Sequence, residues 1–358
     1  MSFETLLQEV PYSVPTQARR ADLLASLNVL GHHHMRGSEA YRRIIDGLWN
    51  GKADAATLEE LPYLPVSLFK TLSLASVPQQ DIKLTLTSSG TTGQSVSRVM
   101  VDAETSLRQQ SALANSLTHV LGKKRLPMLV LDTQDVYKNP AMMSARGAGV
   151  LGMMRYGRDH VFALKPDLSP DVDAVQAFLH KHDETPFFMF GFTFLVWTAF
   201  FEAFEAQGLD LSHGVLIHSG GWKKMIDRAV DNTVFRQRFA MSMGLSKIYN
   251  FYGMVEQLGS IFLEGPQGLL YPPNFSDVII RDPVTWEPVP LGQPGLIQVL
   301  SLVPKSYPGN SLLTEDLGCI ELEDPGTDGW RGPGLRILGR VPKAELRGCS
   351  DVVASKAA

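Results

Sequence analysis

A run of small polar residues, Thr87-Ser-Ser-Gly-Thr-Thr-Gly93, has the composition of a phosphate-binding loop. Its hydroxyl and main-chain N–H groups can donate hydrogen bonds to phosphate oxygens, and Gly90 and Gly93 let the backbone approach a ligand closely. It is not a P-loop, because two residues separate the glycines and no Lys-Ser/Thr pair follows. An ordinary polar turn is the alternative, so this loop alone favours phosphate binding weakly.

Three later motifs carry groups that suit the rest of a nucleotide. In His218-Ser-Gly-Gly-Trp-Lys-Lys224, glycines can lie against a flat ring and Lys223 or Lys224 can meet phosphate. Glu256 follows Gly253 by three residues, and a carboxylate beside polyphosphate suits Mg²⁺. Asp316 can accept two hydrogen bonds from a sugar diol. Taken singly, each motif also fits a solvated turn or an exposed charge.

Histidine and cysteine patterns do not predict a metal centre. We expect Gly31-His-His-His-Met-Arg-Gly37 to form a solvated loop between two helices, because consecutive residues of a regular element cannot all face one ion. Two cysteines, Cys319 and Cys349, make neither a disulfide framework nor a zinc site.

Composition narrows the class of protein further. The 358 residues are 44% hydrophobic and 20% charged, with a formal net charge of -4. This balance argues against a dedicated nucleic-acid binder, which is usually basic. No amino-terminal signal pattern occurs, and the apolar stretch 185–200 is shorter than the ~20 residues that span a bilayer. We therefore expect a cytoplasmic protein with no membrane span.

Hydrophobic periodicity predicts the elements that position these motifs. Helices are expected at 23–30, 41–48 and 104–121, and the polar loop is expected at the tip of a hairpin whose second strand is 98–101. Strands and helices then alternate, which predicts an α/β fold with a largely parallel sheet. The strands are 128–132, 187–190 and 214–218, and the helices are 171–181, 193–206 and 223–243. After 247 the expected elements are short strands, at 250–253, 278–280, 295–301 and 319–323.

In their order along the chain, the motifs resemble those of the adenylate-forming enzymes. The matching residues are Thr87–Gly93, Gly220-Gly221, Tyr252-Gly253-x-x-Glu256, Thr314-Glu-Asp316 and Gly339-Arg340. Finer features are similar to the acyl-protein synthetase branch, the LuxE family. These are Leu61-Pro-x-Leu-Pro-Val-x-Leu-Phe-Lys70, His218-x-Gly-Gly-Trp-Lys-Lys224, Ser306-Tyr-Pro-Gly309 and Glu345-Leu-Arg-Gly-Cys-Ser-Asp351. The resemblance runs from about Leu23 to Asp351.

The resemblance implies the large domain of an adenylate-forming enzyme, an α/β fold in which helices sandwich mixed sheets beside a smaller β-rich subdomain. We expect a catalytic domain at 1–340, α/β to about 246 and β-rich over about 247–340. Residues 341–358 are expected to form a short, mobile carboxy-terminal arm, the vestige of a larger segment.

The same resemblance implies activation of a carboxylic acid, here a fatty acid, as acyl-AMP with ATP and Mg²⁺. Adenine is expected near Gly220, Gly221 and Tyr252, ribose at Asp316, and Mg²⁺ at Glu256, and Gly253 is expected among the residues that bind the nucleotide. Arg340 is expected near phosphate or ribose. The phosphates are expected on the loop residues Ser88, Ser89, Gly90, Thr91, Thr92 and Gly93.

Two departures from relatives affect the chemistry. Most relatives carry a lid domain after the Gly-Arg pair, with a lysine that assists adenylation, whereas 18 residues follow Arg340 here. Lys343 is not expected to inherit that role, and Arg340, Lys223 or Lys224 are the candidate cations. The second departure is Cys349, which the resemblance implies as a thioester acceptor. An extended arm of nine residues from Arg340 reaches roughly 30 Å, and an accidental terminal cysteine is the alternative.

The acid substrate, the partner protein and the alternative functions rest on different observations. The aromatic stretch 186–197 could line an acyl pocket, although such a stripe is more often plain core, and Cys319 is expected to be inert core. The acyl group would pass to a partner such as an acyl reductase. A carboxylate–CoA ligase resembling phenylacetate-CoA ligase is one alternative. A non-catalytic nucleotide-binding subunit is the other.

Overall fold

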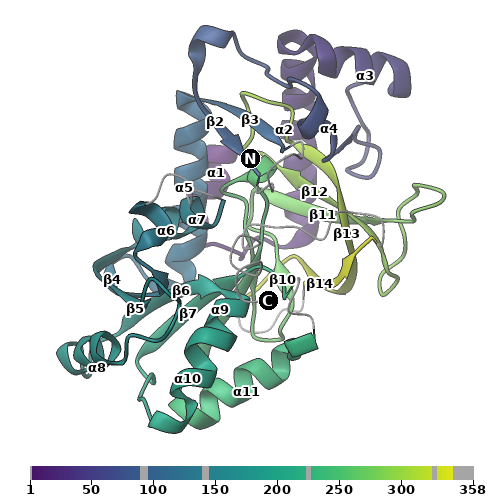
Figure 1. The fold of residues 1–358 in the computed structure, drawn as a ribbon. Coiled ribbons are helices and arrows are strands. Elements are labelled where there is room, and N and C mark those ends of the chain that lie inside the picture. The colour runs from purple at the N-terminus through teal and green to yellow at the C-terminus, as the bar shows by residue number, and fades with distance from the viewer. Residues whose placement is uncertain (1, 89–95, 139–144, 223–226, 325–328, 342–358) are drawn as a thin grey trace. The chain divides into compact units, whose positions relative to one another are not determined.

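The computed structural model describes residues 2–88, 96–138, 145–222, 227–324 and 329–341, which form two compact units (Figure 1). The first contains the described residues of 1–88, 94–119 and 253–345. The second contains those of 120–252.

Helices form the beginning of the first unit. Their starts follow capping rules: the hydroxyls of Ser2 and Ser38 accept hydrogen bonds from Thr5 N and Tyr41 N, which satisfies otherwise unpaired helical N–H groups. The helices are α1 (Phe3–Gln8), α2 (Thr16–Gly37), α3 (Glu39–Trp49), the short α4 (Leu68–Thr71) and, after a hairpin, α5 (Ala103–Leu121).

The histidine run is part of α2, so the predicted loop at 31–37 is wrong. The intrahelical pattern continues to Gly37, and the three rings diverge. His32 contacts Asp54, His33 contacts the Lys305 carbonyl, and buried His34 contacts the Ser76 hydroxyl. Adjacent residues of a helix point about 100° apart. The rings therefore have separate structural partners instead of one ion.

An antiparallel sheet completes the first unit. Its strands lie in the order β11, β12, β13, β14, β10 and β9, and β1 (Leu64–Pro65) adds to β13 in parallel. β2 (Ile82–Thr87) and β3 (Arg98–Asp102) form a separate hairpin, as predicted. The sheet strands are β9 (Phe262–Glu264), β10 (Leu270–Tyr271), β11 (Ser276–Arg281), β12 (Gly295–Ser301), β13 (Ser311–Glu323) and β14 (Pro333–Arg340).

The core of this unit joins its amino-terminal helices to β11 and β12. Leu23 and Leu27 of α2 are fully buried, and they pack with Ile279 and Leu300 from the two strands. Burying one such side chain contributes about 1.5–3 kcal/mol. The helices and the sheet are therefore held together by apolar surface that neither could bury alone.

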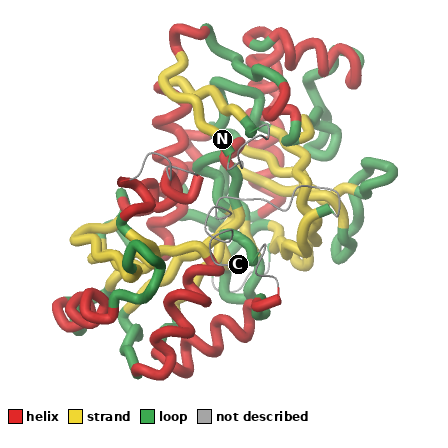
Figure 2. Tube along the Cα trace, viewed as in Figure 1, coloured by secondary structure: helices red, strands yellow, loops and turns green. Residues whose placement is uncertain are grey.

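The second unit is a parallel sheet in the order β8, β7, β6, β4 and β5. Figure 2 shows the strands in yellow and the helices in red. Helices alternate with the strands along the chain, which confirms the predicted α/β fold. The strands are β4 (Leu126–Thr133), β5 (Gly157–Leu164), β6 (Phe187–Phe192), β7 (Gly214–Ser219) and β8 (Lys247–Tyr252). The helices are α6 (Asp135–Lys138), α7 (Ala145–Met154), α8 (Val172–Lys181), α9 (Thr193–Leu195), α10 (Glu202–Phe204) and α11 (Asn232–Met243), with a π-helical stretch (Val196–Phe201) joining α9 to α10.

Some element boundaries differ from the predictions. α11 begins at Asn232 instead of 223, because the Asp231 side chain caps it by accepting from Thr233 N. Glu315 and Asp316 lie within β13, and the strand continues through Gly318, where its register against β14 shifts. β5, α7 and β14 are elements that the periodicity did not predict.

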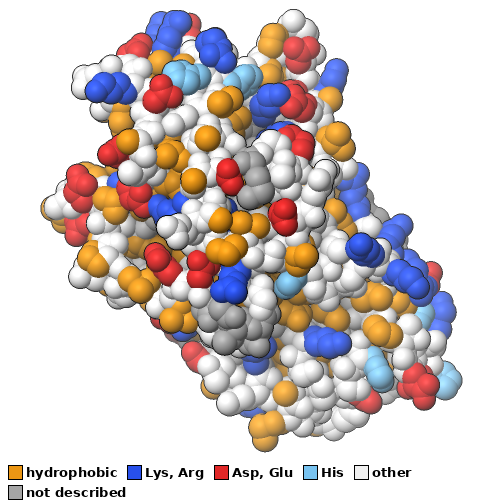
Figure 3. All heavy atoms as spheres, turned by 180° about the vertical axis from the view of Figure 1, so that it is seen from behind, with side chains coloured by type: hydrophobic (Ala, Val, Ile, Leu, Met, Phe, Trp, Pro, Cys, Tyr) orange, Lys and Arg blue, Asp and Glu red, His pale blue; other side chains and the backbone are white. Residues whose placement is uncertain are grey.

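Lys and Arg side chains are interspersed with Asp and Glu on the face shown in Figure 3. Among the helices that the structure describes, none is both long enough and apolar enough to cross a membrane.

Candidate functional site

Ser88 and Ser97 join the two ends of the loop region at the end of the β2–β3 hairpin where the loop connects the two strands. Ser88 N donates to Ser97 O over 3.2 Å, and Ser97 N donates to Ser88 Oγ over 2.9 Å. The loop residues Ser89, Gly90, Thr91, Thr92 and Gly93 lie outside the described part of the chain. The structure therefore describes the predicted phosphate loop only where it joins β2 and β3.

Glu256 lies beside this hairpin end, on a single 3₁₀ turn (Val255–Gln257), and is buried, with 5% of its surface exposed. Burial raises the pKa of Glu256 above its usual value. A hydrogen bond from Ser97 and the positive charges of Lys70 and Arg340 oppose that rise. Glu256 is thus a desolvated carboxylate next to cations, not the exposed charge that its loop position suggested.

The backbone around Glu256 is fixed from the Ser306–Gly309 segment. Gln257 Nε2 donates to Gly309 O over 2.8 Å. A Cβ on Gly309 would lie 2.7 Å from Glu256 O, so no larger residue fits there without a shift. Ser306 Oγ donates to Met100 O of β3 over 2.8 Å. The Ser-Tyr-Pro-Gly motif therefore ties the 3₁₀ turn to the strand that leaves the loop.

Asp316 and Arg340 face each other across β13 and β14. They are register partners, and Arg340 Nε donates to Asp316 Oδ1 over 3.0 Å. Both side chains are partly exposed, at 17% for Asp316 and 32% for Arg340. The acceptor proposed for a ribose diol is therefore oriented by a cation and still reachable.

Lys70 is a charged residue of this cluster for which the sequence motifs predicted no role. Its Nζ lies 4.0 Å from Glu315 Oε1, and its charge acts on Glu256. The signal was present in the sequence, since Lys70 ends the Leu61–Lys70 motif. The first unit thus brings together Ser88, Glu256, Asp316 and Arg340 of the predicted site, and adds Lys70 and Ser97.

The second unit holds the residues predicted near adenine. Gly220 and Gly221 follow the end of β7, and Gly220 has φ +87°, a conformation that favours glycine. Ser219 Oγ donates to Phe251 O of β8 over 3.0 Å. Tyr252 is the last residue of β8 and is partly exposed, and Gly253 follows it. The glycine turn and the tyrosine thus come from adjacent parallel strands.

His218 is a buried polar group in this unit. Its Nδ1 lies 2.9 Å from Thr193 Oγ1, its ring stacks on Phe235 at 4.8 Å, and its Nε2 has no hydrogen-bond partner among the described residues. Burial lowers the pKa of His218 to about 3. His218 is therefore neutral in the folded protein at ordinary pH.

The aromatic stretch 186–197 is packed into the interior. Met189 and Trp197 belong to the core between the sheet and its helices, where Trp197 stacks on Phe201 at 4.5 Å. An acyl pocket formed by this stretch stays a prediction. Lys223, Lys224 and Cys349 lie outside the described residues, and Cys319 is buried in β13, as expected.

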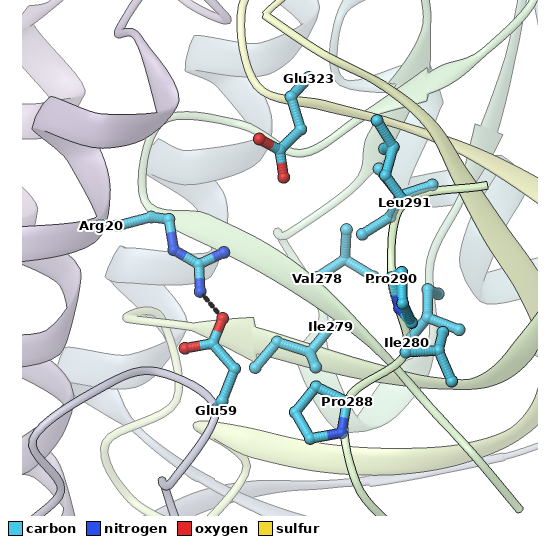
Figure 4. Close-up of a pocket in the computed structure, with 11 residues that line it drawn as sticks. Arg20, Glu59, Val278, Ile279, Ile280, Pro288, Pro290, Leu291 and Glu323 are labelled. Carbon is cyan, nitrogen blue, oxygen red and sulfur yellow. Dashed lines mark hydrogen bonds and ion pairs between the residues drawn. The ribbon is translucent and has the colours of Figure 1, made fainter. Parts of the chain in front are cut away.

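A separate pocket in the first unit contains none of the predicted site residues. Arg20 and Glu59 form an ion pair at one side, and an apolar wall faces them (Figure 4). Its lining has few groups that could bind a polyphosphate. The lining residues are Arg20, Glu59, Val278, Ile279, Ile280, Pro288, Val289, Pro290, Leu291, Ile320 and Glu323.

The family model and the curated relatives that match this chain point to the same family. Residues 8–358 match the family described as acyl-protein synthetase, LuxE. The chain is 24% identical over 339 residues to a long-chain-fatty-acid–luciferin-component ligase of Vibrio harveyi, covering 89% of this chain and 83% of that protein. The ligase of the same name from Aliivibrio fischeri is 24% identical over 312 residues, covering 82% and 78%.

A solved structure of similar fold is 2-hydroxyisobutyryl-CoA ligase in complex with 2-HIB-AMP and CoA. Its TM-score is 0.67 at 17% sequence identity, and the match covers 93% of this chain and 72% of the ligase. At this identity the likeness concerns the fold.

Proposed function

Because the chain belongs to the acyl-protein synthetase (LuxE) family, we propose that it activates a long-chain fatty acid with ATP. The acyl group then passes to Cys349 and on to an acyl reductase. The observation that carries the proposal is the meeting of Glu256, Asp316 and Arg340 beside the ends of the Ser88–Gly93 loop region. Carboxylates and cations in this arrangement suit a nucleoside triphosphate. The two curated relatives are named for ligation of long-chain fatty acids.

Adenylation requires charge stabilisation more than proton transfer. The fatty acid is ionised near neutral pH, so one carboxylate oxygen can attack the α-phosphorus without a general base. The new O–P bond forms as the bond from the α-phosphorus to the bridging oxygen breaks, and pyrophosphate leaves with the electron pair. Charge accumulates on phosphoryl oxygens, and fixed donors and cations lower that barrier.

Each predicted site residue in the first unit has a role in this proposal. Ser88 and the loop after it bind the departing phosphates, Asp316 accepts from the ribose hydroxyls, and Arg340 orients Asp316. Glu256 would hold Mg²⁺. Among the described residues no group of three or more His, Cys, Asp or Glu converges on one point, but Mg²⁺ commonly uses one or two carboxylates together with substrate phosphates. A metal would neutralise phosphate charge there.

In the second unit, Gly220, Gly221 and Tyr252 are proposed to contact adenine and Lys223 to contact phosphate. Gly253, the next residue along the chain after Tyr252, is also proposed to contact the nucleotide. The second half-reaction uses Cys349. Its thiolate attacks the acyl carbonyl, the thioester C–S bond forms, and AMP leaves with the electrons of the acyl–oxygen bond. Delivery to the reductase follows by exchange of that thioester.

Covalent labelling tests the acceptor. The wild-type chain, Cys349→Ser and Cys319→Ser are incubated with ATP, Mg²⁺ and radiolabelled long-chain acid, and protein-bound label is counted after denaturation. Cys319 is the matched control, because it is the other cysteine and lies buried in β13. We expect label on wild type and Cys319→Ser, removable by hydroxylamine, and none on Cys349→Ser.

Two results would contradict this proposal. Equal labelling of Cys349→Ser would place the acceptor elsewhere. Acyl-CoA formation that survives Cys349→Ser would favour the carboxylate–CoA ligase reading.

A further inference from the structure

Lys70 is fixed beside the charged cluster by strand pairing. β1 pairs in parallel with β13 at Leu64–Leu312 and Pro65–Leu313, and Val66 N donates to Leu313 O over 2.9 Å. The chain then enters α4, which carries Lys70. The start of α4 is therefore anchored to β13 two residues before Glu315.

Packing holds α4 in this position. A helix of four residues has little stability of its own, but Phe69 is 1% exposed and meets Tyr307 edge-on at 6.0 Å. Tyr307 OH lies 3.4 Å from Gln109 Nε2, its hydrogen-bond donor. Because Phe69 is buried, the neighbouring Lys70 is directed to the surface of the cluster, where its side chain is 26% exposed.

The charges around Lys70 leave its ammonium weakly held. The contact with Glu315 is 4.0 Å long, beyond hydrogen-bond distance. Such a partly exposed ion pair contributes little to stability. By contrast, Arg340, the other cation that acts on Glu256, donates a hydrogen bond to Asp316. Lys70 can therefore turn toward a new anion at small cost.

The position of Lys70 matches one part of ATP. Lys70 Nζ approaches Glu315, and Arg340 donates to Asp316, the next residue of β13. The charges of Lys70 and Arg340 both act on Glu256. The α-phosphate of ATP is bonded to the ribose on one side and to the other phosphates on the other side. Lys70 is a cation near both the neighbour of the proposed ribose acceptor and the proposed Mg²⁺ ligand Glu256, so its position suits that group.

We propose that Lys70 contacts the α-phosphate and stabilises the charge that develops there during adenylation. This inference rests on the proposed function. Lys70 donates hydrogen bonds to phosphoryl oxygens and transfers no proton to the acid. Lys70, on α4, would thus be the cation that assists adenylation, a role for which the sequence analysis named Arg340, Lys223 and Lys224 as candidates. The second half-reaction, from acyl-AMP to Cys349, does not need this charge.

The test separates the two half-reactions. Acid-dependent exchange of labelled pyrophosphate into ATP reports adenylation, and labelling of Cys349 by chemically prepared acyl-AMP reports transfer without ATP. Lys70→Met and Lys70→Arg are compared with wild type and with Lys83→Met, a matched change at an exposed lysine of β2. ATP binding by calorimetry and the melting temperature are measured for all four.

Lys70→Met should lower kcat for exchange about 10²- to 10³-fold, the usual effect of losing one charge-stabilising donor. Labelling by acyl-AMP and the melting temperature should stay near wild type, and ATP affinity should change less than kcat. Lys70→Arg should recover part of the exchange, and Lys83→Met should retain all of it.

Three outcomes divide the possibilities. Exchange by Lys70→Met at the wild-type rate would overturn the role of Lys70 while leaving the proposed function intact. A parallel loss in both half-reactions, with a lower melting temperature, would also overturn it and assign Lys70 a structural role. If none of the acids supports pyrophosphate exchange by the wild-type chain, and acyl-AMP does not label it, the proposed function itself would be overturned.

Discussion

The two carboxylates of the first-unit site differ in environment. Asp316 is partly exposed and accepts from Arg340, whereas Glu256 is buried and accepts from Ser97. A buried carboxylate costs free energy unless charge compensates it. A bound cation would supply that compensation, so Glu256 has the properties of a residue kept for binding at the expense of stability.

Replacing Glu256 by Gln should therefore stabilise the empty protein and impair the reaction. A carboxyl whose pKa is raised by folding destabilises the folded state once it ionises. This penalty is absent below the unfolded value of 4.5 and grows as the pH rises through the folded value. Without ATP or Mg²⁺, the melting temperature of Glu256→Gln should exceed that of wild type by more at pH 8 than at pH 5. Pyrophosphate exchange should fall at least about 10-fold.

Glu60→Gln, a change at an exposed carboxylate, is the control and should leave both quantities near wild type. A Glu256→Gln variant that is less stable than wild type at pH 8, or that exchanges pyrophosphate normally, would refute this account of Glu256.

At the scale of elements, the sequence predicted those helices and strands that a local hydrophobic pattern marks. The β2–β3 hairpin and the parallel strands were predicted because apolar alternation and short apolar runs are local signals. The same reasoning failed at His32–His34, where polar side chains hid a helix that tertiary contacts support. β14 was missed because its pairing with β13 is not visible from its own residues. The burial of Glu256 has the same origin, since Ser97 and Gly309 come from distant segments.

β7 carries an acid-sensitive group in the second unit. Burial lowers the pKa of His218 to about 3 from 6.5, so the folded chain holds it neutral while the unfolded chain protonates below about 6.5. The unfolding free energy should therefore be fully retained above that value and fall with acidification. Between pH 7 and pH 5 the loss from His218 is about 2 kcal/mol. Buried His34, whose pKa is also lowered by burial, adds a loss of the same sign.

Urea unfolding of wild type, His218→Asn and His180→Asn at both pH values measures this slope. Asn can keep the hydrogen bond to Thr193, and His180 is an exposed histidine of α8. His218→Asn should be less stable at pH 7 yet lose about 2 kcal/mol less than wild type on going to pH 5. Equal slopes for wild type and His218→Asn would contradict a neutral His218.

At the scale of the whole molecule, family membership was predictable because several weak motifs occur in one order. Thr87–Gly93, Gly220-Gly221, Glu256, Asp316 and Arg340 are each ordinary residues in isolation, and their order over most of the chain is specific. Spatial detail was not predictable in the same way. Lys70 was known as the end of a motif, but its approach to Glu256 depends on the pairing of β1 with β13.

Acid-dependent exchange of labelled pyrophosphate into ATP tests the central claim most directly. The full chain with Mg²⁺ is assayed against saturated acids of increasing length and one aromatic acid, with ATP binding measured in parallel. We predict exchange that requires both acid and Mg²⁺ and is strongest with long-chain acids. ATP binding without exchange for any acid would contradict adenylation and favour a non-catalytic nucleotide-binding subunit.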